Sequence, residues 1–248
     1  MTVKTIYSML PDAGALISLE PEELAGIVLE HIKSHSGLNQ GYVNRYNFGI
    51  AGNTYSEFPI ERQDHVGKAL MEAWMWLERE GLIAPKLEDT GLWFYVTKRG
   101  QRIDGSAGIE AYRRSAVLPK QFLHPTIAQK CWSSFLRGEY DTSVFQGFKE
   151  LEVAIRAAIN ASDDLLGTDL ARRAFATEGG LLTNATAQRG EKEALGHMMA
   201  GALGSYKNPH SHRNVALSVE EAAEMLIHAS HLLKIVDART AALNAPKD

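Results

Sequence analysis

The chain has 248 residues, 45% hydrophobic and 23% charged, which is close to the averages for globular proteins and excludes a fibrous or wholly disordered protein. At roughly 100 to 200 residues per domain, this length predicts two domains or one large domain. The formal net charge of -4 excludes a global basic field for nucleic acid, so any contact with nucleic acid has to be local.

Cysteine content and the apolar pattern narrow the class of protein further. The single cysteine, Cys131, excludes a disulfide framework or a cysteine zinc cluster within one chain. Residues Met1 to Asp12 lack the pattern of a secretory signal, and no apolar run approaches the roughly 18 residues of a membrane span. We therefore expect a cytoplasmic protein without a membrane partner.

The first helix is predicted to open near Ser18, with Ser18 as its cap and Pro21 in its first turn. Apolar residues then recur at helical spacing from Leu24 to Ile32. Residues 37–55 are rich in glycine, asparagine and tyrosine, which predicts a loop-rich insertion with at most one short element. No specific structure is assigned to this insertion.

A second helix is predicted over Glu61 to Glu80, ending at Gly81 in a left-handed cap. Trp74 lies on its apolar stripe and is expected in the core, whereas Trp76 lies off the stripe and is expected on a contact surface. Two β-prone runs follow, Leu82 to Lys86 and Leu92 to Thr97, and they predict a β-hairpin.

This order of elements, from Gly81-Leu82-Ile83 to the run Phe94 to Gly100, resembles a winged helix-turn-helix domain, which we assign to residues 1–120. The resemblance implies that Lys98, Arg99 and Arg102 contact phosphates of a nucleic acid, as a wing does. A helix followed by a hairpin also occurs as a plain packing module, and a solvated basic loop remains the alternative for these three residues.

From about Leu123 onward the pattern is all-helical, which predicts a helical bundle over residues 121–248 and a mainly α protein with one small hairpin. The last helix is the clearest, because Ser218 stands at its N-cap position with glutamates in the first turn. The predicted helices are Thr126 to Arg137, Thr142 to Asn160, Leu165 to Ala176, Lys192 to Lys207 and Val219 to Thr240.

Charged and titratable side chains gather where the fourth of these helices ends. Pro209 has no backbone donor and disfavours the α region for Asn208, so the helix is predicted to end near Tyr206 to Asn208. The turn then gathers Lys207, His210, His212 and Arg213, a set that suits an anionic ligand. An ordinary C-terminal turn, in which these side chains cap carbonyls, is the alternative.

Several spaced blocks resemble the bacterial Ymh family over roughly residues 122 to 240. The blocks are Phe148 to Arg156, Asp169-Leu170, Ala174-Phe175, Gly201 to Gly204, Lys207-Asn208-Pro209 and His212-Arg213. That family in turn resembles the HEPN superfamily, helical bundles that carry an arginine, a polar residue, three variable residues and a histidine. The resemblance implies a HEPN-like bundle, with Lys207 in place of the usual arginine.

Many HEPN proteins are dimeric, metal-independent ribonucleases or toxins, frequently in phage defence, so the resemblance implies that activity, with RNA as substrate and no cofactor. His212 would be the acid or base, Lys207 the phosphate cation and Asn208 an orienting group, with His210 and Arg213 flanking them. A homodimer would bring two histidines together. The alternative is a non-catalytic regulator that dimerises through the bundle and binds DNA or a protein through residues 1–120.

Two further pairs of residues leave alternatives open. Glu152 and Arg156 stand four apart on one helix, and the simplest interpretation is a surface ion pair. Alternatively, both face the bundle interior and orient the turn as supporting residues. His228 and His231 are compatible with a zinc site, but no carboxylate or cysteine stands at ligand spacing beside them, so no metal is expected.

Overall fold

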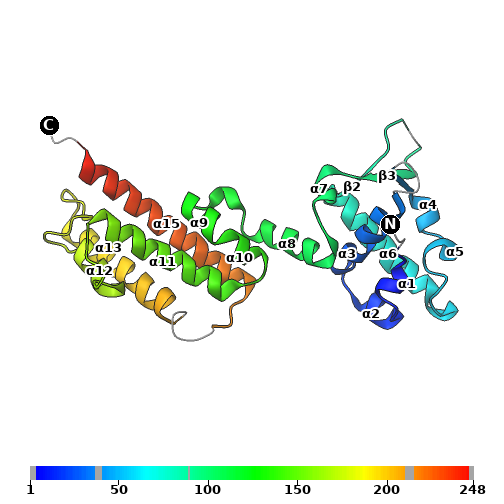
Figure 1. Cartoon of the computed structure of the whole chain (residues 1–248), viewed down its shortest axis with the longest axis horizontal. Coiled ribbons are helices and arrows are strands. Elements are labelled where there is room, and N and C mark those ends of the chain that lie inside the picture. The colour runs from blue at the N-terminus through cyan, green and yellow to red at the C-terminus, as the bar shows by residue number, and fades with distance from the viewer. Residues whose placement is uncertain (1–3, 37–40, 89, 210–214, 246–248) are drawn as a thin grey trace. The chain divides into compact units, whose positions relative to one another are not determined.

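The computed structural model describes residues 4–36, 41–88, 90–209 and 215–245, and divides the chain into two compact units, 1–113 and 114–248. Helices dominate both units, and the β-structure of the described residues is one small sheet in the N-terminal unit (Figure 1). The prediction of a mainly α protein with a small hairpin is confirmed.

The N-terminal unit places short helices and a three-stranded sheet around two longer helices. Its elements are α1 (Ile6–Met9), α2 (Ala13–Ser18), α3 (Pro21–Ser36), β1 (Tyr42–Asn44), α4 (Arg45–Phe48), α5 (Ala51–Thr54), η1 (Ile60–Arg62), α6 (Gln63–Arg79), β2 (Ile83–Pro85), β3 (Trp93–Val96), α7 (Lys98–Gln101) and the start of α8 (Gly105–Val117).

The predicted hairpin is present as β2 and β3, and β1 adds a third strand. Both pairings are antiparallel and the strand order is β1-β3-β2, so β3 is central. β1, α4 and α5 all lie inside residues 37–55, so the expectation of a loop with at most one short element there is wrong. The sheet therefore joins the hairpin to a strand that precedes α6 in the chain.

The second predicted helix is confirmed as α6, and its end has the expected geometry. Gly81 adopts a positive φ of 66°, and the Leu82 amide donates to the Leu77 carbonyl at 2.9 Å, which is a Schellman cap. Trp74 is fully buried, with its ring 4.9 Å from that of Phe48 and 5.2 Å from that of Phe94. This aromatic cluster joins α6 to α4 and to β3.

Two details of the N-terminal predictions are wrong. Ser18 is the last residue of α2, so it does not cap α3, which begins at Pro21. Trp76 is not on a contact surface: it is 8% exposed, and its ring lies edge-on to that of Tyr112 on α8 at 6.4 Å. A covering helix that the sequence pattern did not predict buries this second tryptophan.

The C-terminal unit is a bundle in which α11 and α15 lie side by side (Figure 1). Its elements are the end of α8, η2 (Lys120–Phe122), α9 (Pro125–Lys130), α10 (Trp132–Leu136), α11 (Tyr140–Ala158), α12 (Gly167–Ala174), α13 (Arg189–Ala202), η3 (Leu203–Lys207) and α15 (Val219–Asn244). The first predicted helix of this unit is split at Cys131 into α9 and α10.

The start of α15 confirms the predicted cap. The Ser218 hydroxyl accepts from the Glu221 amide, while the Glu221 carboxylate accepts from the Ser218 amide, so a complete capping box opens this helix. α11 supplies the centre of the core with Val144, Phe148, Leu151 and Ile155, all fully buried. The bundle thus has its own apolar core, separate from that of the N-terminal unit.

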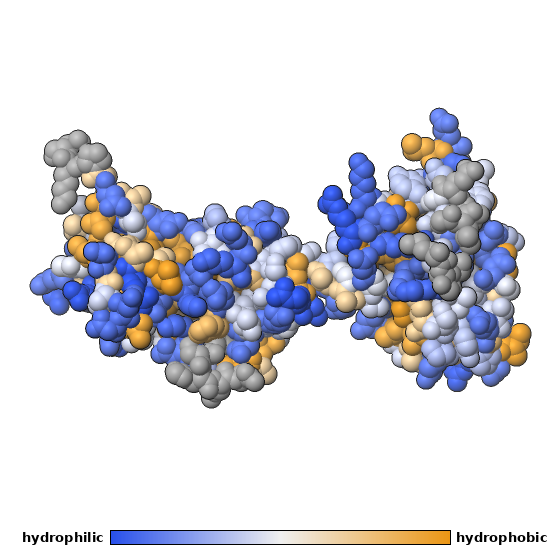
Figure 2. Space-filling model, viewed as in Figure 1, coloured by the Kyte–Doolittle hydropathy of each residue, from blue (hydrophilic) through white to orange (hydrophobic). Residues whose placement is uncertain are grey.

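On the face shown in Figure 2, hydrophilic residues cover most of both units, and hydrophobic residues reach the surface in separate patches. Scattered apolar side chains of this kind are normal for a folded protein surface. Within the described ranges, no helix combines the length and the apolar character needed to cross a lipid bilayer.

Candidate functional site

A buried carboxylate stands at the centre of the polar network in the bundle. Glu152, near the middle of α11, is only 5% exposed. Its Oε2 lies 2.7 Å from Lys207 Nζ, and its Oε1 lies 2.9 Å from Arg156 Nη2. A buried charge is tolerated only when it is paired and hydrogen-bonded, and here two cations share one carboxylate.

The backbone of α12 supplies a third donor. The Gly167 amide donates to Glu152 Oε2 at 2.9 Å, so the carboxylate lies at the N-terminus of α12, where the helix dipole favours negative charge. Gly167 has a φ of 54°, a conformation that glycine adopts without strain. A glycine at this position therefore lets the chain turn into α12 while its amide faces the carboxylate.

Arg156 ties the same network to the loop before α12. Arg156 lies one turn after Glu152 on α11, and its Nη2 also donates to the Leu165 carbonyl at 3.1 Å. Its Nε is buried and has no hydrogen-bond partner within the described residues. The guanidinium is thus held between α11 and the 159–166 loop, and its side chain is 16% exposed.

Opposing effects set the pKa of Glu152. Burial raises the pKa, but the hydrogen bonds from Lys207, Arg156 and the Gly167 amide outweigh it and hold the pKa below its usual range. Glu152 is therefore ionised at neutral pH. The ammonium of Lys207 faces a full negative charge and is held in a fixed position.

Lys207 occupies an irregular turn of helix. α13 continues into η3, a π-helical turn in which the Asn208 amide donates to the Leu203 carbonyl, five residues back. The predicted helix end near Tyr206 to Asn208 is wrong: Asn208 has helical angles of -61° and -46°, and Pro209 is also helical. The wider π spacing lets the helix continue into a residue that has no N–H to donate.

The structure thus brings together some of the residues singled out from the sequence. Lys207, Glu152 and Arg156 form one cluster, and the exposed Asn208 follows Lys207 on the same helical stretch. The interpretation of Glu152 and Arg156 as a surface ion pair is wrong, because both side chains are largely buried. Glu152 also contacts Lys207 and the start of α12, and Arg156 contacts the loop before α12. His210, His212 and Arg213 lie outside the described residues.

Tyr206, which precedes Lys207 in the chain, lines a pocket of about 370 Å³ that sequence reasoning did not identify. The Tyr206 ring stacks on Phe148 at 5.0 Å and lies edge-on to His228 at 5.9 Å. Burial, followed by the nearby His231, lowers the pKa of His228. The pocket is lined by Tyr206, Glu221, Glu224, Met225 and His228.

Of the three basic residues predicted to contact nucleic acid, Lys98 and Arg99 lie on α7 and Arg102 is its C-cap, so all three follow β3 and lie away from the hairpin tip. All three are exposed. Arg99 has a structural role, because its Nη1 donates to the Glu80 carbonyl at 3.0 Å, at the C-terminus of α6. Lys98 and Arg102 make no ion pair within the part of the chain that the structure describes.

Over residues 4–36, 41–88, 90–209 and 215–245, no group of three or more histidine, cysteine, aspartate or glutamate side chains is placed to hold an ion. Cys131 is buried, and burial, followed by the charge of Glu150, raises its pKa to about 12. Its thiol is an inert part of the core at neutral pH.

Comparison with known protein families gives a match in the C-terminal part of the chain. Neither the curated proteins nor the solved structures gave a match to this sequence. The segment 121–236, which contains Glu152, Arg156 and Lys207, matches the model of a protein family described as a protein of unknown function, Hypoth_ymh. The C-terminal unit of this chain is therefore similar to the Ymh family.

Proposed function

We propose that the C-terminal unit is a HEPN-like domain that cleaves RNA without a metal ion, in the setting of a toxin or phage-defence system. The observation that carries this proposal is the buried Glu152, which holds Lys207 Nζ at 2.7 Å at the start of the histidine-containing segment. The resemblance of the 207–213 run to the HEPN motif supports it independently.

Charge favours an anionic ligand at this position. Glu152 carries one negative charge while Lys207 and Arg156 carry two positive charges, so these three groups together have a formal charge of +1. A phosphodiester in cleavage gathers negative charge on its non-bridging oxygens, and a cation fixed beside them stabilises the transition state. Fixing Lys207 beforehand removes the cost of ordering its flexible side chain during the reaction.

In this proposal each polar residue has one role. His212 takes or donates a proton at the reacting 2'-hydroxyl or leaving oxygen, and Asn208 orients one of the partners. Glu152 and Arg156 are positioning residues that act through Lys207. Because one motif supplies one such histidine, a homodimer with two motifs facing each other would supply both the acid and the base.

The test is incubation of the untagged protein with total RNA in the presence of a chelator. His212→Ala and Lys207→Ala are each expected to lower the cleavage rate by about 100-fold or more. Lys149→Ala is the matched control, because Lys149 is an exposed lysine on α11 without an ion pair in the described structure. Cleavage that needs a metal, or that is retained in His212→Ala, would contradict the proposal.

A second proposal concerns the N-terminal unit, which we infer to be a winged-helix module that binds duplex DNA or a protein partner, with the helical unit as a non-catalytic dimerisation domain. The strand order β1-β3-β2, with α6 directly before the hairpin, supports it. The exposed positions of α6 include the acidic Asp64 and Glu72 as well as the basic Lys68 and Arg79, so the charge of this helix does not favour DNA contact. Contact would instead use Lys98 and Arg102 on phosphates.

Duplex binding measured over a range of salt concentrations tests this second function. If Lys98 and Arg102 contact phosphates, Lys98→Ala with Arg102→Ala should reduce the slope of log affinity against log salt by about 2. Arg99 is left unchanged because it caps α6. An unchanged slope excludes DNA contact by α7, and a protein partner would then be the remaining role for the module.

A further inference from the structure

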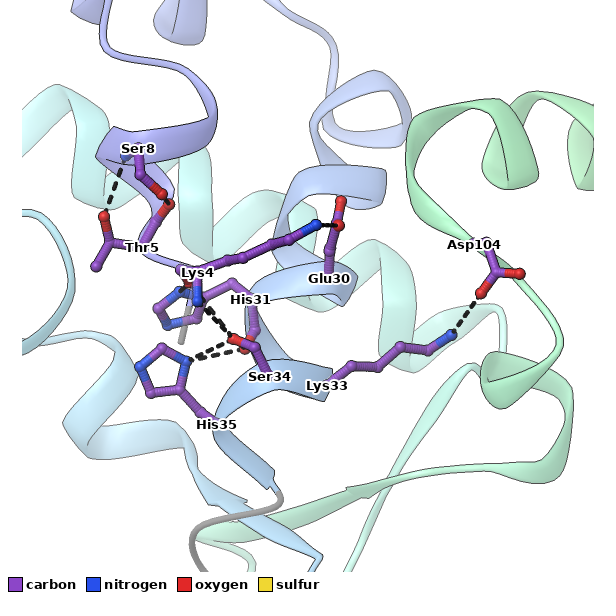
Figure 3. A network of polar contacts seen from close by, with 9 residues as sticks. All are labelled: Lys4, Thr5, Ser8, Glu30, His31, Lys33, Ser34, His35 and Asp104. Atoms are coloured by element: carbon purple, nitrogen blue, oxygen red, sulfur yellow. Dashed lines mark hydrogen bonds and ion pairs between the residues drawn. The ribbon is translucent and has the colours of Figure 1, made fainter. Parts of the chain in front are cut away.

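The N-terminal unit contains a pair of histidines that neither proposal uses. His31 and His35 lie one turn apart on the same face of α3, with ring centroids 4.0 Å apart and an interplanar angle of 33° (Figure 3). His31 is 4% exposed, and His35 is half-buried. Two histidines at positions i and i+4 of a helix can bind one metal ion together.

Hydrogen bonds orient both rings in the same way. His31 Nδ1 lies 3.0 Å from the Lys4 carbonyl, and His35 Nδ1 lies 2.9 Å from the His31 carbonyl. A carbonyl only accepts, so each Nδ1 carries a proton and donates it. Each Nε2 of the neutral rings is then left with a bare lone pair.

This arrangement is the one that metal-binding histidines adopt. The ring nitrogen away from the metal donates to a backbone carbonyl or carboxylate, which fixes the tautomer and raises the basicity of the other nitrogen. Within the described residues, no hydrogen-bond partner is found for either Nε2 atom.

Both rings line a pocket of about 220 Å³ beside β1, α4 and α5. The remaining lining is neutral, with amide groups from Asn44, Asn47 and Asn53 and the hydroxyl of the buried Thr54. No carboxylate lines this pocket in the described part of the chain, which disfavours calcium and magnesium. Imidazole nitrogens instead prefer late first-row metals such as copper, nickel and zinc.

We propose that His31 and His35 bind one late first-row divalent metal ion through their Nε2 atoms, at the wall of this pocket. The pair supplies two ligands, and the remaining coordination positions face the pocket, where water or another small oxygen ligand can occupy them between the amide groups of Asn47 and Asn53. The site would therefore be open to an exogenous ligand, unlike a closed structural zinc site with four protein ligands.

The experiment uses Cu²⁺ as the probe, since copper binds such ligands most tightly among the divalent ions. Chelator-treated, untagged full-length protein is titrated with Cu²⁺ and followed by electron paramagnetic resonance. His210→Gln, His212→Gln, His228→Gln and His231→Gln are introduced into every sample, because these two other pairs of closely spaced histidines could also bind copper. One equivalent of Cu²⁺ is expected to bind with two imidazole nitrogens in its coordination sphere.

Variants at the site and away from it decide the outcome. His35→Gln should weaken Cu²⁺ binding at least about tenfold, while His65→Gln, at an exposed single histidine on α6, should leave it unchanged. His35→Cys should retain binding and add a sulfur-to-metal charge-transfer band with Co²⁺, a signature that a structural role cannot produce. Equal affinity in the parent and His35→Gln, or no charge-transfer band in a folded His35→Cys protein, would overturn the proposal.

Discussion

Lys207 Nζ lies 2.7 Å from Glu152 Oε2, although the two residues stand 55 positions apart in the chain. The contact joins η3 to α11 and, through Gly167, to the start of α12. A buried carboxylate with two cations is costly to form and more costly to break, because removing one member leaves the others buried without compensation. The stability of the bundle should therefore depend on this cluster.

Glu152→Gln removes the negative charge while keeping the size of the side chain. We expect it to lower the free energy of unfolding of the C-terminal unit by about 3 kcal/mol, since Lys207 and Arg156 lose their counter-charge. Urea unfolding monitored by circular dichroism measures the change. Glu139→Gln, which removes a carboxylate from an exposed pair with Arg137, is the control and should leave the midpoint nearly unchanged.

The same carboxylate predicts a dependence of stability on pH. Because the folded pKa of Glu152 lies below its unfolded value of about 4.3, the unfolded state binds the proton first as pH falls. The stabilisation is fully present above that unfolded value and is lost as pH falls through the folded pKa. Unfolding midpoints of the parent and of Glu152→Gln should converge on acidification, and a constant difference down to pH ~2 would contradict this.

Cys131 should be unreactive toward thiol reagents in the native protein. The residue is fully buried, and burial, with the charge of Glu150, raises its pKa to about 12, so little thiolate exists at neutral pH. Reaction with an aromatic disulfide reagent should be slow in buffer and complete in denaturant. Rapid stoichiometric labelling of the folded protein would show that α9 and α10 open readily.

Gly26 on α3 allows a close approach of α8. A Cβ at this position would lie 2.5 Å from the Cα of Ser106, which is backbone and cannot move independently. Gly26→Ala should therefore destabilise the N-terminal unit by about 2 kcal/mol. Gly52→Ala on α5 is the matched control, because an added Cβ there meets nothing within 4 Å, and the two thermal midpoints can be compared directly.

The sequence predicted most of the helices and the hairpin because those signals are local. Apolar spacing located α6, α11 and α15, and the residues Ser218 and Gly81 marked one start and one end correctly. β1 was missed, since a three-residue strand in a segment rich in glycine and asparagine has no periodicity of its own. It forms only because β3 offers it an edge to pair with.

The candidate site was predicted in part. Glu152 and Arg156 four apart look the same on a surface helix as in a bundle interior, and local spacing cannot distinguish the two. What buries them is the packing of η3 and α12 against α11, a long-range contact. Pro209 was interpreted as a helix end because the rule assumes α-helical spacing, whereas the chain passes through a π turn.

That π turn also determines the rotational phase of everything that follows it. Each residue of an α-helix advances by ~100° around the axis, so a turn that takes in one extra residue rotates the rest of the helix by about that angle. The extra residue therefore determines that the Lys207 side chain points toward Glu152. Deleting a single residue between Leu203 and Tyr206 would turn the lysine toward another face and uncouple the two charges, although every ionisable group in the chain would still be present.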